Sequence, residues 1–80
     1  MPTIFNEAGF RFMIYVHDNA PAHIHVLGYG GAVELPIEPL SLRAVRGPLT
    51  DAQVRKVVQI ARDRRSELLQ AWRKHHGWAD

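Results

Sequence analysis

Two histidines separated by one residue, His23 and His25, are the sharpest chemical feature of the sequence. In a β-strand, residues i and i+2 project from the same face, with their α-carbons roughly 6 to 7 Å apart. Two imidazoles at this spacing can ligate zinc, copper or nickel. They can also act as general acid and general base on a phosphodiester, because imidazole titrates near neutral pH. The alternative interpretation is a solvated strand that carries two histidines without a shared function.

A metal site at this pair would need a third ligand. His17, Asp18 and Glu34 are candidates, but none stands at the spacing of a recognised metal motif from His23 and His25. We therefore expect no bound metal and no other cofactor. If the chain is an enzyme, we expect a metal-independent ribonuclease in which these two histidines are catalytic.

The strand positions that share the parity of the histidines also carry groups that bind anions and bases. They include Arg11, Tyr15 and Arg43, which together with Arg46 could form an anion-binding patch beside the histidines. Arginine holds phosphate through two parallel hydrogen bonds, and tyrosine offers a surface for an unpaired base. We expect Arg11, Tyr15 and Arg43 to bind the substrate. The alternative is cross-strand ion pairing of the arginines with Glu34 and Glu38.

Length and composition restrict the kind of protein that can position these residues. Eighty residues with 46% hydrophobic and 22% charged side chains suit one globular domain, residues 1–80. No apolar run is long enough to cross a bilayer, and no basic residue precedes an apolar stretch at the N-terminus. The chain has no cysteine, so it has no disulfide framework and no thiolate site. We expect a cytoplasmic protein without a membrane partner. The formal net charge of +2 permits an RNA or an acidic protein partner and requires neither.

The first half of the chain, from about residue 10 to 46, is typical of a β-sheet. Strands are predicted at residues 9–16, 23–27 and 32–37, and Gly28 to Gly31 suits a tight hairpin turn. Pro36 predicts an edge strand or an early end to the third strand. Residues 40–45 form either a fourth strand or an irregular connector.

One long helix is predicted from about residue 51 to 76. Thr50 and Gln53 match the capping box, and no proline or glycine interrupts the segment up to His75. Apolar residues recur at helical spacing and form one stripe: Val54, Val57, Val58, Ala61, Leu68, Leu69 and Trp72. Arg65 interrupts this stripe, and we expect its head to lie in water. The predicted fold is α+β, an antiparallel sheet of three or four strands followed by this helix packed on one face.

Alternation along the strands sorts their side chains into two faces. One face is apolar and must be covered by the helix: Phe10, Phe12, Ile14, Val16, Ile24, Val26, Val33, Leu35, Ile37, Leu40 and Leu42. The other face contains both histidines and the substrate-binding candidates, together with Met13, His17, Glu34, Glu38 and Ser41. Because the sequence offers no second helix, we expect this face to be open to solvent.

Five short elements occur in order along nearly the whole chain: PTIF at residues 2–5, GFRF at 9–12, Tyr15, PxHxHV at 21–26 and LLxAW at 68–72. In these elements the chain resembles a family of very small bacterial proteins, the domain of unknown function DUF4160. Members often have proline where this chain has Ala22. The family motif contains His23 and His25, but the resemblance assigns them no role. It implies a component of a toxin–antitoxin-type pair, encoded beside a second small protein.

We therefore predict a component of such a two-protein module that binds its cognate partner, with RNA as a candidate substrate of the His23/His25 face. The alternative is a non-enzymatic module, either an adaptor or the antitoxin, that docks a partner through a sheet face or edge. Homodimerisation is compatible with both interpretations. A third class is a metal-binding protein that uses the histidines.

Overall fold

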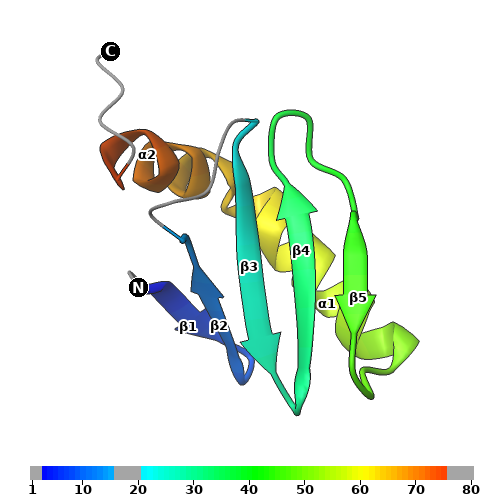
Figure 1. Ribbon diagram of the computed structural model, residues 1–80. Coiled ribbons are helices and arrows are strands. Elements are labelled where there is room, and N and C mark those ends of the chain that lie inside the picture. The colour runs from blue at the N-terminus through cyan, green and yellow to red at the C-terminus, as the bar shows by residue number, and fades with distance from the viewer. Residues whose placement is uncertain (1–2, 16–20, 76–80) are drawn as a thin grey trace.

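The computed structural model describes residues 3–15 and 21–75. In these residues five strands form one antiparallel sheet in the order β1-β2-β3-β4-β5, and two helices follow. The elements are β1 (Thr3–Glu7), β2 (Phe10–Met13), β3 (His23–Gly28), β4 (Gly31–Pro36), β5 (Ala44–Arg46), α1 (Asp51–Asp63) and α2 (Arg65–His75). Both helices lie behind one face of the sheet (Figure 1). The α+β class is confirmed, whereas the predicted strand number and the single helix were wrong.

Two-residue turns join the two tight hairpins. Ala8 and Gly9 connect β1 to β2 with φ of 56° and 82°, and Tyr29 and Gly30 connect β3 to β4 with φ of 52° and 76°. Positive φ at both positions is the backbone of a type I′ turn, whose twist matches that of the strands. The turn predicted at residues 28–31 is confirmed. Strand β1 was missed because Gly9 was taken as the start of a strand, when it is the second residue of a turn.

The segment after β4 is partly strand and partly connector. Pro36 ends β4, which lies inside the sheet between β3 and β5, so the edge-strand interpretation of Pro36 was wrong. Leu40 forms a single bridge with Ile37, and only Ala44–Arg46 pairs regularly with β4. Leu42, predicted to lie in the core, is 49% exposed, because the chain at residues 41–43 is not a strand and does not alternate.

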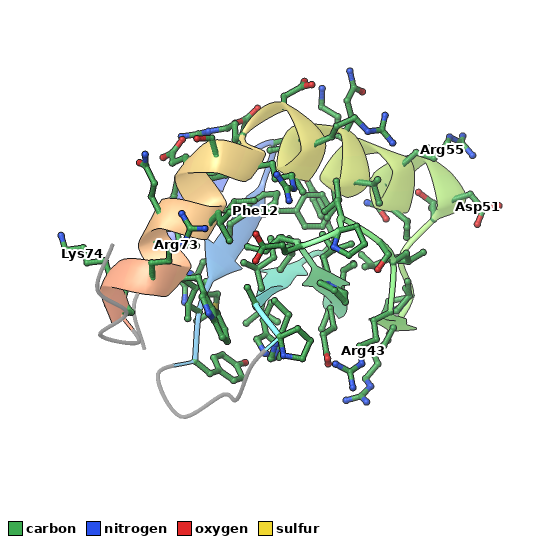
Figure 2. The ribbon with its side chains drawn as sticks, turned by 90° about the horizontal axis from the view of Figure 1, so that it is seen from above. Phe12, Arg43, Asp51, Arg55, Arg73 and Lys74 are labelled. Carbon is green, nitrogen blue, oxygen red and sulfur yellow. The ribbon has the colours of Figure 1, made fainter. Side chains whose placement is uncertain are left out.

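The helix begins where its capping signal predicted. The Gln53 amide donates to Thr50 Oγ1, and the Thr50 amide donates to Gln53 Oε1, which completes the capping box. A turn at Arg64 then separates α1 from α2, although the Arg64 amide still donates to Ile60 and the Leu68 amide to Arg64. The predicted continuous helix is therefore two helices that meet at an angle, as Figure 2 shows. The predicted end at residue 76 lies outside the described residues.

Arg64, at the junction of the helices, connects them to β1. Its guanidinium contacts the carboxylates of Glu7 and Glu67, each at 2.8 Å, and lies 3.4 Å above the Phe5 ring. The hydrogen bond to Glu7 is the main reason that the pKa of Arg64 is raised above its ordinary value, partial burial opposes the shift, and Glu67 adds to it. The neighbouring Arg65 donates to the carbonyl of Ile37 at 2.6 Å, so the expectation that its head lies in water was wrong. Both arginines hold the bend against the sheet.

The core lies between the helices and one face of the sheet. Phe12 points from β2 toward the helices (Figure 2) and stacks on Phe5 with ring centroids 4.7 Å apart. The fully buried residues of this core include Phe12, Ile14, Ile24, Val26, Leu35, Ile37, Val57, Ala61, Leu68 and Trp72. The predicted apolar face of the sheet is thus confirmed for β2, β3 and β4. In the described part of the chain, neither helix has the length and apolar character needed to cross a membrane.

Replacing Thr50 by Ala should lower the free energy of unfolding by about 1 kcal/mol, because the first turn of α1 loses a hydrogen-bond acceptor for the Gln53 amide. Urea denaturation followed by circular dichroism measures this change. Gln70→Ala, at an exposed position of α2, is the matched control and should leave stability within about 0.5 kcal/mol of the parent. Equal losses in the two variants would contradict the assigned cap.

Candidate functional site

His23 and His25 lie on the same side of β3, as their spacing predicted. They stand opposite Pro36 and Glu34 of β4, and their rings meet edge to face with centroids 5.3 Å apart. Their surroundings nevertheless differ, so the two imidazoles are suited to different chemical roles.

His23 is buried, with 8% of its surface exposed. Its ring centroid lies 5.3 Å from that of Trp72, which α2 brings to this end of the sheet. Its Nδ1 donates to the Pro21 carbonyl at 2.9 Å, and because a carbonyl only accepts, that nitrogen carries a proton. The expectation that His23 is displayed on an open face was therefore wrong, because the helical layer reaches around to its ring.

His25 is only partly buried and carries an aromatic neighbour. The Tyr15 ring is stacked on it, nearly parallel at 8° and with centroids 4.0 Å apart. Met13 lies directly opposite His25 on β2 and opposite Thr3 on its other side. Met13 was predicted to face solvent, but it is 1% exposed. The face that carries His25 is therefore covered at this position.

Glu34 lies opposite His25 on β4, and this pairing was not predicted. Directly opposed residues of an antiparallel pair have β-carbons about 4.5 to 5.5 Å apart, which brings the carboxylate and the imidazole within reach of one substrate group. The Arg43 guanidinium approaches the Glu34 carboxylate to 3.3 Å, as the ion-pair alternative predicted, and it points away from the helices (Figure 2). The length of the turn at residues 28–31 could have predicted the pairing of His25 with Glu34, because it sets which residues of β3 and β4 face each other.

A shallow hollow of about 40 Å³ opens beside His25 and Glu34. The remaining lining residues are Ala32, Val33, Ala44 and Arg46. Ala44 and Arg46 come from β5; the small alanine side chain leaves room, and the arginine supplies positive charge. The hollow holds about three water molecules, since one buried water needs on the order of 10–15 Å³ of such space. It suits a small anionic group better than a whole nucleotide.

The other predicted site residues lie around this centre. Arg11 is exposed and pairs with Leu27, which makes it a diagonal neighbour of His25 on the side away from the hollow. Glu38 approaches Arg73 at 4.0 Å and takes no part in the site. In residues 3–15 and 21–75, no three ligand-type side chains gather as a metal ion would require. The proposed third ligands His17 and Asp18 lie outside the described residues.

The two histidines should respond differently to truncation. His23→Ala removes a buried ring that packs against Trp72 and should lower the free energy of unfolding by about 1–3 kcal/mol. His25→Ala, at a partly exposed position, should cost less than about 1 kcal/mol. Urea unfolding of both variants measures the difference, and equal costs would show that His23 is not the structural member of the pair.

Comparison with known proteins agrees with the resemblance seen in the sequence. The family model described as a domain of unknown function (DUF4160) matches residues 9–73, which include every strand except β1 and nearly all of both helices. No curated protein and no solved structure matches the chain. The chain therefore belongs to the DUF4160 family.

Proposed function

We propose that this protein is the RNA-cleaving member of a toxin–antitoxin-type pair and acts at the open face of its sheet. One observation carries the chemistry: His25 and Glu34 face each other on neighbouring strands and line one hollow with Arg46. An imidazole, a carboxylate and guanidinium groups are together sufficient for phosphodiester cleavage by proton transfer and charge stabilisation. The proposal moves the acid–base pair from His23/His25 to His25/Glu34.

In the proposed reaction, the Glu34 carboxylate accepts the proton of a ribose 2′-hydroxyl. The 2′-oxygen forms a bond to phosphorus as the bond from phosphorus to the 5′-oxygen breaks. His25, protonated at the start, donates its proton to that leaving oxygen. The products are a 2′,3′-cyclic phosphate and a free 5′-hydroxyl, so atoms and charges balance without a further reactant.

The arginines would bind the negatively charged groups of the site and of the substrate. The Arg43 guanidinium, 3.3 Å from the Glu34 carboxylate, would hold that carboxylate in position beside the hollow. Arg46 lines the hollow and supports binding of the non-bridging phosphate oxygens, on which negative charge accumulates in the transition state. Arg11, diagonal to His25, is suited to contact a neighbouring phosphate.

The aromatic groups would orient the substrate. Tyr15 and His25 form one stacked surface, and an unpaired base of any identity can stack on such a surface. His23, buried between Trp72 and His25, would act as a positioning residue that limits the rotation of the His25 ring. Its burial argues against a direct role in proton transfer.

His25→Ala and Glu34→Gln should each reduce cleavage of single-stranded RNA by at least about 100-fold, because each removes one proton-transfer group. A fluorogenic RNA oligonucleotide measures the rate, and chelator should leave the parent rate unchanged. The matched control is Glu38→Gln, which removes a carboxylate outside the hollow and should retain parental activity. Full activity in His25→Ala, or a 5′-phosphate product, would contradict the mechanism.

Expression of the chain alone in a bacterial host should slow growth, and co-expression of the neighbouring small protein should restore it. The Glu34→Gln variant should slow growth much less, since its fold is retained and its proposed base is absent. Growth curves with matched expression levels test this. Equal inhibition by the parent and by Glu34→Gln would show that the toxicity does not come from the proposed chemistry.

A further inference from the structure

A second surface lies away from the imidazole face, where β5 forms the last strand of the sheet. A groove of about 600 Å³ lies between α1 and Leu42, two residues before β5. Its lining residues are Leu42, Val54, Arg55, Val58, Gln59, Arg62 and Asp63. A volume of this order accommodates several side chains, since ligand sites span roughly 300–1,000 Å³.

The groove is apolar at its centre. Val54 and Val58 stand one helical turn apart on α1 and are only partly buried, and Leu42 faces them with 49% of its surface exposed. Val45 of β5, opposite the buried Val33, remains 40% exposed because α1 leaves this end of the sheet incompletely covered. Leu42 and Val45 are two of the three large hydrophobic residues that are exposed in the described part of the chain.

The rim of the groove is basic. Arg55 and Arg62 line it. Neither arginine takes part in an ion pair within residues 3–15 and 21–75. Asp63 is the single acidic lining residue. This distribution favours an occupant with negative charge beside apolar side chains.

A second copy of this chain fits the surface poorly. Antiparallel pairing of two β5 strands would place Arg46 of both copies in one short two-stranded seam. Like charges on neighbouring strands destabilise such a pair, whereas an acidic segment meets no such repulsion.

We propose that the β5 edge and this groove bind an extended, acidic segment of another protein. The segment would add a strand to β5 through main-chain hydrogen bonds and place alternate apolar side chains between Leu42 and Val58. Its carboxylates would pair with Arg55 and Arg62. The inference identifies the chemistry of the partner in the two-protein module and rests on the proposed function only for the existence of that partner.

Selection of a phage-displayed library of random twelve-residue peptides on the intact protein tests the inference. Enriched peptides should alternate acidic with β-branched or leucine residues. A synthetic peptide of the enriched sequence should shift the amide resonances of Ala44–Arg46 and of the α1 residues that line the groove. Enrichment without an acidic excess, shifts confined to the Tyr15/His25 face, or no enrichment would each overturn the proposal, as would preferential binding of an RNA oligonucleotide in the groove.

Substitutions in the groove then show which residues contribute to the affinity for the selected peptide. The double substitution Arg55→Glu and Arg62→Glu should weaken the selected peptide at least 10-fold, and Leu42→Ser should weaken it several-fold. Lys56→Glu, on the same helix but outside the groove lining, is the matched control and should bind within twofold of the parent. Circular dichroism verifies that each variant is folded, and unchanged affinity in folded groove variants would overturn the proposal. RNA cleavage by these variants should equal that of the parent, so failure of the docking surface and failure of the cleavage mechanism remain distinguishable.

Discussion

The pairing of His25 with Glu34 depends on one constraint, the length and handedness of the turn between β3 and β4. Tyr29 and Gly30 adopt positive φ, so Gly28 stands opposite Gly31 and, three residues further from the turn, His25 stands opposite Glu34. A slip of one residue would carry the Glu34 side chain to the helix-covered face, because side chains alternate. The Tyr29 hydroxyl also donates to the Ala8 carbonyl at 3.1 Å, which ties this turn to the turn of the first hairpin.

The helical layer determines which histidine remains accessible. Arg64 holds the junction of α1 and α2 to β1 through Glu7 and Phe5, and Arg65 holds it to the carbonyl of Ile37. With the bend fixed, α2 places Trp72 against His23 and leaves His25 to the open face. Two histidines that are equivalent by strand parity thus become a packing residue and a candidate reacting group. The division follows from tertiary packing at the sheet end and not from the strand itself.

Much of this arrangement could be predicted from the sequence, and the failures have physical causes. Periodicity predicted the covered face and the amphipathic helical segment, and turn chemistry predicted the second hairpin, because both signals are local. Strand β1 was missed because its turn uses Ala8 at positive φ, where asparagine or aspartate would have given a clear signal. The bend at Arg64 was missed because its partner Glu7 is distant in sequence, and no proline or glycine marks it. His23 and His25 lie on one side of β3 as predicted, but the burial of His23 could not be predicted from strand parity, since it depends on Trp72 of α2.

The proposed chemistry requires that a phosphodiester bind where β3, β4 and β5 adjoin on the open face. Titration of the ¹⁵N-labelled protein with an RNA oligonucleotide, protected from cleavage by 2′-deoxy substitution at the scissile position, measures this most directly. We expect saturable shifts of the His25 ring resonances and of the amides of Glu34, Ala44 and Arg46, with little change at His23. Saturable shifts confined to α1 and α2, or the absence of any shift at His25, would contradict it.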